Sequence, residues 1–253
     1  MDILRIAELF GAGLVLGALG GLLGIGGGMF AIPLLGLWLG LDQQHAQGTS
    51  LVMVVPNVAV GLWNYARRGA LDKRLSLALA VAALPCTYLG ARIAVHVPSA
   101  PLRIAFAIFL LCIAGFSAYR ALARRAPGAA ERVPAPWQAA FGVGGLGGIL
   151  SGLFGVGGAV FAVPLTSFLF GVSQAAAQGL GLALVAPGTL VGVATYAVAG
   201  DVDWAVGIPL AIGGVLSVPS GVKVAYKLPE RTLRLAFTAL MVVAALALIV
   251  RAA

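Results

Sequence analysis

The chain has 253 residues, of which 61% are hydrophobic and only 9% are charged, whereas about 25% of the residues of a soluble domain are charged. Its mean hydropathy is +1.05, and apolar runs of about 20 residues, long enough to cross a bilayer, recur along it. The net charge of +8 does not indicate a nucleic-acid partner, because the basic residues lie in short clusters between apolar runs, where they orient membrane helices. We therefore predict an all-α polytopic membrane protein.

The chain repeats itself, because residues 17–109 align with residues 148–240 at a constant offset of 131 without a gap. Each copy consists of a glycine-rich run, at 9–41 or 137–171, followed by three apolar helices. The expected helices are 44–66, 73–95 and 101–120 in copy one and 174–198, 204–226 and 231–250 in copy two. We divide the chain into a first transmembrane repeat (1–120), a polar cytoplasmic linker (121–136) and a second repeat (137–253), which together form one integrated domain.

The glycine-rich run of each copy is interrupted at its centre. Copy one reads GLLGIGGGMFAIPL at 21–34, and copy two reads GLFGVGGAVFAVPL at 152–165. Glycine is about 1 kcal/mol less favourable than alanine inside a helix, and about 33 residues are too few for two full crossings of about 20 residues each. We predict that each run forms a re-entrant or discontinuous pair of helices, which membrane depth tolerates only where protein or a wet cavity covers it.

Polar residues mark the helix starts and the orientation of the copies. Asp42 and Ser173 are suited to cap helix N-termini, as are Asp72 and Asp203, for which proton coupling is the alternative. Twelve of the sixteen Lys and Arg residues fall into three clusters, at 67–74, 120–132 and 223–234. Basic loops face the cytoplasm, and all three clusters do so only if the two copies have opposite orientations. The charge pattern therefore predicts two inverted repeats.

The glycine breaks are the main candidates for a binding site. Glycine lets the backbone leave the helix, and a helix that starts at the break directs unpaired N–H groups and a partial positive charge towards it. Such an arrangement binds anions without a charged side chain. The residues concerned are Gly26, Gly27 and Gly28 in copy one and Gly157 and Gly158 in copy two. The alternative is close helix packing, which we favour for Gly13, Gly17, Gly144 and Gly148.

Polar residues of the next helix are the second candidates, since polar groups inside a membrane span often mark a pathway. They are Gln47, Thr49, Ser50 and Asn57 in copy one and Gln178 in copy two. For Thr49 and Ser50, a hydrogen bond to their own helix backbone is an equal alternative.

Two further aligned pairs lie near helix ends. We expect Tyr65 and Tyr196 to belong to an aromatic belt at the membrane surface. Arg92 and Lys223 either snorkel to the interface or attract anions to the two mouths of the protein.

The sequence does not indicate an enzyme, a metal site or a cofactor. Cys86 and Cys112 lack metal-binding spacing, the glycine runs lack the GKS or GKT of a nucleotide-binding loop, and no Ser/His pair stands in facing spans.

In their order and spacing, these motifs resemble the TauE/SafE sulfite exporter family, also called the TSUP permeases. The resemblance covers nearly the whole chain. It rests on the two glycine blocks, on QGTSL at 47–51, on the Y-x3-G-x2-D pattern that begins at Tyr65 and again at Tyr196, and on GARIAVHVP at 90–98 with GVKVAYKLP at 221–229. Copy two departs at Leu180 and Gly181, where copy one has Thr49 and Ser50, so only copy one supplies these hydroxyls.

The resemblance implies a bacterial inner-membrane permease for small anions, often sulfite, sulfonates or other sulfur-containing acids, in a family with both exporters and importers. We predict a secondary transporter that binds the anion at the glycine breaks, orients it with the polar side chains named above and works by alternating access. Its partners are a small anionic substrate and membrane lipid, while a coupling ion and a homo-oligomer are left open. The alternatives are a non-transporting membrane assembly protein that holds a partner helix, and a passive anion channel.

Overall fold

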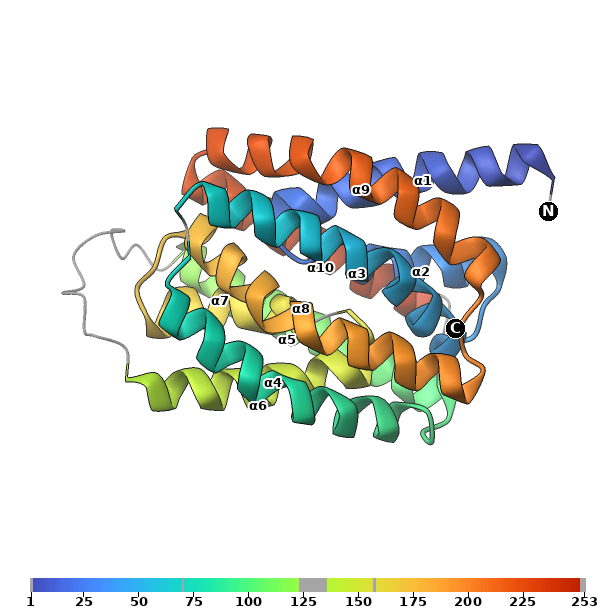
Figure 1. Ribbon diagram of the computed structural model, residues 1–253, viewed down its shortest axis with the longest axis horizontal. Coiled ribbons are helices and arrows are strands. Elements are labelled where there is room, and N and C mark those ends of the chain that lie inside the picture. Colours follow the sequence, from blue (N-terminus) through green and yellow to red (C-terminus); the bar gives the residue numbers. More distant parts are fainter. Residues whose placement is uncertain (1, 70, 123–135, 157, 251–253) are drawn as a thin grey trace.

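The computed structural model describes residues 2–69, 71–122, 136–156 and 158–250, a range that leaves out most of the predicted linker. These residues form ten helices and no strand (Figure 1). The helices are α1 (Ile3–Leu23), α2 (Gly28–Leu39), α3 (Gln43–Arg67), α4 (Lys73–Ala94), α5 (Ser99–Leu122), α6 (Trp137–Phe154), α7 (Ala159–Leu169), α8 (Gln174–Ala199), α9 (Trp204–Lys227) and α10 (Glu230–Val250). Seven helices in the described ranges are long and apolar enough to cross a membrane, which confirms the predicted fold class.

The predicted helix starts are confirmed by their caps. The side chains of Asp42 and Ser173 accept hydrogen bonds from backbone N–H groups in the first turns of α3 and α8, at 2.9 and 3.2 Å. Asp72 and Asp203 likewise each accept from two N–H groups, at the starts of α4 and α9. Capping is therefore what both of these carboxylates do. The six helices predicted after the two glycine-rich runs begin and end within two residues of the predicted positions.

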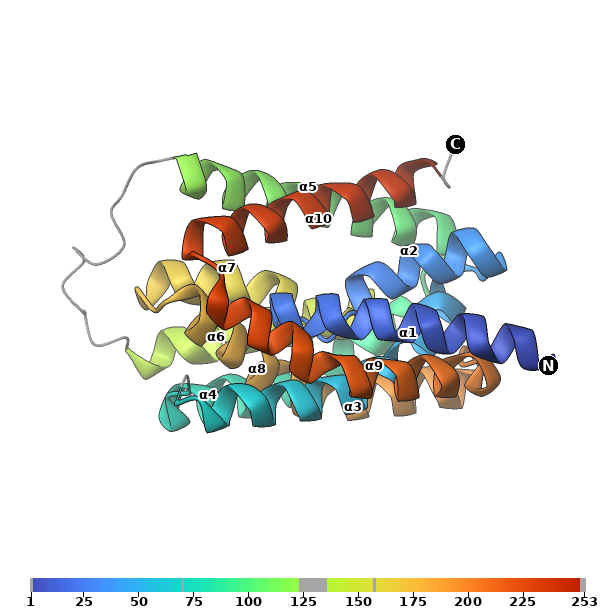
Figure 2. The same cartoon turned by 90° about the horizontal axis from the view of Figure 1, so that it is seen from above.

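Both glycine-rich runs are interrupted where predicted. The α1 helix ends at Gly24, which has a φ of 66°, and Gly26 and Gly27 also have positive φ values before α2 begins at Gly28. Gly155 ends α6 with a φ of 63°. Figure 2 shows that α2 returns along the bundle in the direction opposite to α1. One detail differs, because α1 starts at Ile3 and has 21 residues. It is thus a membrane-length helix rather than the expected half-helix.

Small residues bring helices of the two copies into close contact. A β-carbon added to Gly13, Gly17 or Gly21 of α1 would collide with the α9 backbone. At the equivalent positions of copy two, a β-carbon on Gly144, Gly148 or Gly152 of α6 would collide with the α4 backbone. The packing interpretation of this stripe is therefore confirmed, and it follows a common rule for membrane helices. In each copy, the second membrane-length helix after the break, α4 or α9, packs against the first helix of the other copy.

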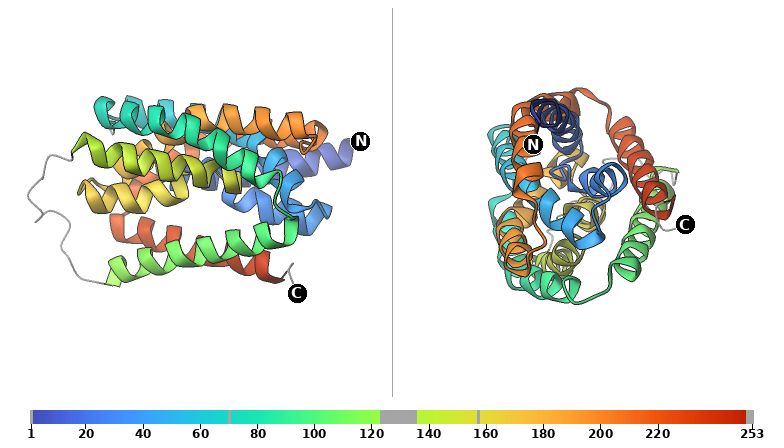
Figure 3. Two further views of the ribbon diagram at one scale, coloured as in Figure 1. Left: turned by 90° about the horizontal axis from the view of Figure 1, so that it is seen from below. Right: turned by 90° about the vertical axis from the view of Figure 1, so that its right-hand side faces the viewer.

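The helices form a main bundle and one separate layer. Figure 3 shows α5 and α10 side by side along one side of the molecule, with the short helices α2 and α7 between this pair and the rest. Equivalent helices of the two copies run in opposite directions along the bundle, and the two chain ends lie at the same end of it (Figures 1 and 2).

Candidate functional site

The two glycine breaks meet in the interior of the bundle. A β-carbon built on Gly28 would lie 3.3 Å from the Cα of Val156 and 3.4 Å from the carbonyl oxygen of Gly155. Gly28 and Val156 are both buried. The N-terminus of α2 therefore lies directly beside the start of the other break, and α2 and α7 run in opposite directions along the bundle (Figure 2).

The backbone of each break leaves hydrogen-bond donors unpaired within its helix. Phe30 and Ala31 donate to the carbonyl oxygen of Gly27, and in the equivalent turn Phe161 and Ala162 donate to that of Gly158. The N–H groups that precede these residues lie too early in the helix to reach an intrahelical acceptor. They concentrate the positive end of each helix dipole at the contact between the breaks.

At the first break, a glutamine of copy two contacts the backbone of copy one. The hydroxyl of Tyr65 lies 2.7 Å from Oε1 of Gln178, to which it donates, and 3.1 Å from the Gly21 carbonyl oxygen. The side-chain amide of Gln178 donates to the carbonyl oxygen of Leu22 at 3.2 Å. Asn57 donates from Nδ2 to the Gly26 carbonyl oxygen at 3.2 Å. These bonds tie α3 and α8 to the end of α1.

The second break repeats this arrangement with the copies exchanged. The hydroxyl of Tyr196 donates to Oε1 of Gln47 at 2.7 Å and lies 3.1 Å from the Gly152 carbonyl oxygen. The Ser50 hydroxyl donates to the Gln47 carbonyl oxygen at 2.8 Å and lies 3.5 Å from the Gly155 carbonyl oxygen. Gln47 is fully buried, and its Nε2 has no hydrogen-bond partner in the described part of the chain. A buried donor of this kind is suited to a ligand acceptor.

Close approach explains why both breaks end a helix with glycine. A β-carbon on Gly24 would collide with the side chain of Gln178, and one on Gly155 would lie 2.8 Å from the β-carbon of Gln47. The two Tyr–Gln pairs lie at different heights, since the 18 residues from Gln47 to Tyr65 span about 27 Å of helix axis. The contact between the breaks lies between the two heights.

The structure brings most of the predicted site residues together. Gln178 and Asn57 border the first break, which contains Gly26, Gly27 and Gly28, and Gln47 and Ser50 border the second, with Gly158 at the start of α7. Thr49 lies elsewhere, because its hydroxyl accepts from the Asp203 N–H at 2.9 Å. Gly157 is outside the described residues.

The two aligned tyrosines do not lie at the membrane surface, where they were predicted. Tyr65 and Tyr196 are fully buried and contact the breaks, so the predicted aromatic belt is wrong for both. Their spacing carried the missing signal. Each tyrosine follows the aligned glutamine of its own helix by 18 residues, which is five turns, so both lie on the same helix face.

A wide cavity opens at one end of the bundle. It has a volume of about 730 Å³ between the C-terminal parts of α4 and α8, and Arg92, His96 and Asp201 contribute its charged or titratable side chains. Arg92 is exposed there. Burial raises the pKa of the Asp201 carboxyl, against the opposing effect of His45, whose Nδ1 lies 3.5 Å from it. The described residues contain no group of three His, Cys, Asp or Glu side chains that could hold a metal ion.

A bundle of membrane-length helices, with paired helix breaks and buried amide side chains inside it, has the architecture of a multi-pass membrane transport protein. Residues 9–248 match the model of the family described as "Sulfite exporter TauE/SafE". The chain therefore belongs to this family of membrane transporters, which is not a family of enzymes.

Curated relatives agree with this assignment. A probable membrane transporter protein of Xylella fastidiosa is 30% identical over 220 residues, which cover 85% of this chain and 83% of the relative. One from Methanocaldococcus jannaschii is 27% identical over 94% of this chain and 93% of its own length. Bacillus subtilis YunE, also named a probable membrane transporter protein, is 24% identical over 87% of this chain and 89% of its own.

Proposed function

We propose that the protein is a secondary transporter that moves a small anion, such as sulfite, a sulfonate or a related sulfur-containing acid, across the bacterial inner membrane by alternating access. The observation that carries the proposal is the contact between the two breaks. It brings the N-terminus of α2 against the backbone of Gly155 and Val156, shortly before α7 begins at Ala159. Unpaired N–H groups and helix dipoles there would attract negative charge without a side-chain cation.

The side chains around this point supply the remaining contacts. Gln47 offers an unpaired Nε2 donor to an anion oxygen. Gln178 and Asn57 hold the backbone at the first break through their bonds to Leu22 and Gly26. At the second break, the Ser50 hydroxyl lies 3.5 Å from the Gly155 carbonyl oxygen. Thr49 is left out of the proposed contacts, because its hydroxyl is already used at the start of α9.

The opposite directions of the two copies support an inverted repeat in the membrane. In such proteins, the two copies exchange conformations around a fixed central site, which exposes that site to each face in turn. The exchange requires the Tyr–Gln contacts at the two heights to rearrange, since each joins one copy to the other.

Flux through liposomes tests the proposal. Gly28→Ala places one methyl group between the breaks, at 2.9 Å from a Val54 methyl and 3.3 Å from the Val156 Cα. We expect saturable flux of sulfite or methanesulfonate for the wild type and a loss of about tenfold or more for Gly28→Ala, because the methyl occupies the anion's place. Gly142→Ala, with nothing within 4 Å of its β-carbon, is the matched control and should transport normally.

Three results would contradict the proposal. Unchanged flux in a folded Gly28→Ala protein would remove the breaks from the pathway. Flux that rises linearly with anion concentration, without saturation, would instead indicate a passive channel. A wild type that transports none of these anions would favour an assembly protein.

A further inference from the structure

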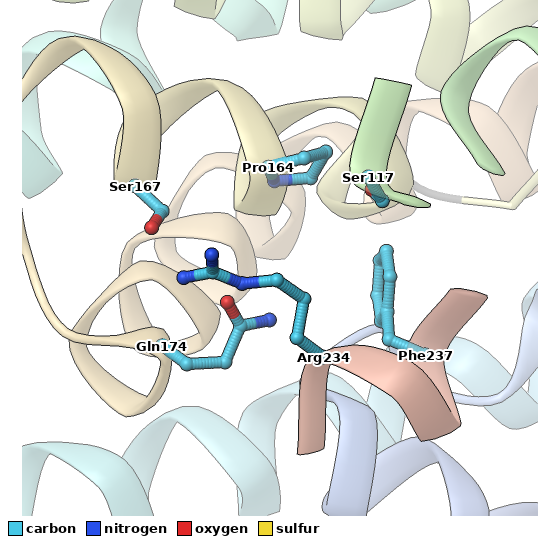
Figure 4. A pocket seen from close by; sticks show the side chains of 6 residues that line it. All are labelled: Ser117, Pro164, Ser167, Gln174, Arg234 and Phe237. Atoms are coloured by element: carbon cyan, nitrogen blue, oxygen red, sulfur yellow. The ribbon is translucent and has the colours of Figure 1, made fainter. Parts of the chain in front are cut away.

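A small polar cavity lies away from the breaks, between α5, α7, α8 and α10. Its lining consists of Ser117, Pro164, Ser167, Gln174, Arg234 and Phe237 (Figure 4). Figure 4 shows the guanidinium group of Arg234 between the side chains of Ser167 and Gln174. The cavity volume is about 10 Å³, which is room for one atom the size of a water oxygen.

Two of the polar side chains around this cavity, Ser117 and Arg234, have no hydrogen-bond or ion-pair partner among the described residues. Ser117 is 3% exposed, and its hydroxyl has no hydrogen-bond partner among the described residues. Gln174 is also 3% exposed. The ion pairs found in the described ranges join His45 to Asp42 and Asp201, so Arg234 has no carboxylate partner there. Because buried polar groups are normally paired, the unpartnered Ser117 hydroxyl in the same cavity as the half-buried Arg234 guanidinium indicates a missing anionic acceptor.

The carboxylate of Glu230 lies near this cavity, but it forms no ion pair with Arg234. Glu230 is the acidic residue closest to Arg234 on α10, one turn earlier, and its Oε1 lies 3.4 Å from the backbone N–H of Gln174. Ser167 donates to the Val172 carbonyl oxygen at 3.3 Å, which keeps its oxygen close to the cavity.

Copy one repeats the Gln, Arg and Phe of this cavity, whereas Leu248 and Gly36 stand at the positions equivalent to Ser117 and Ser167. The offset of 131 places Gln43 and Arg103 at the positions of Gln174 and Arg234, and Phe106 at that of Phe237. Gln43 is 0% exposed and neither of its amide atoms has a partner in the described part of the chain. The Nε of Arg103 is also buried and unpartnered there. Gln and Arg thus stand at the same positions in both copies, and in copy one the Gln43 amide and the Arg103 Nε are buried without a hydrogen-bond partner in the described ranges.

We propose that the Arg234 cavity is a second anion site, which binds a small oxyanion or sulfonate group, and that Gln43 and Arg103 form its counterpart in copy one. One anion oxygen fits the cavity next to the Ser117 hydroxyl. The planar guanidinium group of Arg234 binds two oxygens of one anion with parallel hydrogen bonds, and Gln174 supplies an amide donor.

The position of the site relates it to the breaks. Ser167 lies eight residues after Ala159, the first residue of α7, so about 12 Å of helix separates the cavity from the second break. Since equivalent helices run in opposite directions, the Arg103 counterpart lies towards the other end of the bundle (Figure 2). If the protein transports anions as proposed above, the two sites would bind the transported anion near opposite faces of the membrane. Anion binding at Arg234 does not depend on that function.

Calorimetric titration of the purified full chain with sodium sulfate and with sodium methanesulfonate tests the binding. We expect Arg234→Gln to lower the affinity roughly tenfold to a hundredfold, as the loss of charge-assisted hydrogen bonds does. Arg231→Gln is the matched control, because it removes the same charge from an exposed position three residues earlier on α10. It should bind as the wild type does.

Two further variants cover the case in which Arg234→Gln does not fold. Arg234→Lys keeps the charge but loses the two-oxygen fork, and Ser117→Ala removes one hydroxyl, so both should weaken binding severalfold. Wild-type affinity in folded Arg234 variants, or an equal loss in Arg231→Gln, would overturn the site, the latter by showing a response to surface charge alone.

Oriented membrane vesicles separate this site from the proposed function. We expect Arg234→Gln to raise the half-saturation concentration for anion entry at the face where α10 begins, and Arg103→Gln at the opposite face. An effect of each variant on both faces alike would reject the two-station arrangement. If wild-type vesicles show no flux, the transport proposal fails, while the calorimetric result still decides the anion site.

Discussion

At both glycine breaks, a tyrosine hydroxyl donates at 2.7 Å to a glutamine of the opposite copy and lies 3.1 Å from a backbone carbonyl oxygen. The side-chain amide nitrogens of the two glutamines differ in their hydrogen bonds. Gln178 uses its Nε2 to bind the Leu22 carbonyl oxygen, whereas the Nε2 of Gln47 has no such bond. Copy one also places Asn57 where copy two has Gly188.

This comparison separates framework from function. The interactions that both breaks share hold the bundle together, because they join α3 and α8 to the helix ends of both copies. The differences mark where a ligand has something to bind, since the spare donor of Gln47 is retained at full burial. A pair of equivalent variants, one at each break, therefore tests which kind of role a residue has.

The largest expected effect is on the shared framework. Gly24→Ala and Gly155→Ala combine a positive φ with a collision against a glutamine side chain, so each should destabilise the fold by more than about 3 kcal/mol. Thermal unfolding in detergent measures the loss. Gly200→Ala is the control, because Gly200 has a φ of 86° but open space around it, and it should cost only about 1 kcal/mol. Similar losses for all three would show that the collisions are relieved at little cost.

The glutamines should give different results. Gln178→Leu leaves the Leu22 carbonyl oxygen and the Tyr65 hydroxyl without their partner, so we expect a loss of about 2 kcal/mol in stability with little change in anion affinity. Gln47→Leu should also lower the anion affinity, by about tenfold for one lost hydrogen bond. Unfolding curves and flux at several anion concentrations give the two quantities. Equal affinities in both variants would contradict the assignment of Gln47 as the ligand donor.

A smaller effect is expected from the tyrosines. Tyr65→Phe and Tyr196→Phe each remove one hydroxyl, and each should cost about 1 kcal/mol. Double-mutant cycles with the partner glutamines should show coupling within each pair, Tyr65 with Gln178 and Tyr196 with Gln47, and none between pairs. Additive effects within a pair would mean that the hydroxyl and the amide do not depend on one another.

Asn57→Leu should have the smallest effect on stability. The lost bond to Gly26 is partly offset, because the variant also removes a buried Oδ1 that lacks a partner in the described ranges, and the net change should stay within about 1 kcal/mol. Flux decides its role. Reduced flux in a stable Asn57→Leu protein would place this amide on the pathway, and full flux would leave it as a copy-one variation of the framework.

The sequence was sufficient to predict the elements but not how the copies share them. The offset of 131, the caps at Asp72 and Asp203 and the glycine breaks are local signals, and all of them are present in the structure. An alignment of the copies cannot say which copy a side chain contacts. Gln47 of copy one lies at the break of copy two, and Thr49 contacts the start of α9. A position near a helix end is typical of an interface tyrosine, but Tyr65 is buried because its hydroxyl binds Gln178 of the other copy.

The exchange of helices between the copies constrains how the protein is made. The glycine stripe of α1 is covered by α9, which the ribosome completes about 200 residues later. Until α9 is made, the glycine stripe of α1 is not covered by the helix that contacts it in the folded protein. The glycine stripe of each half is covered by a helix of the other half, so we expect separately expressed halves to be degraded and co-expressed halves to recover each other.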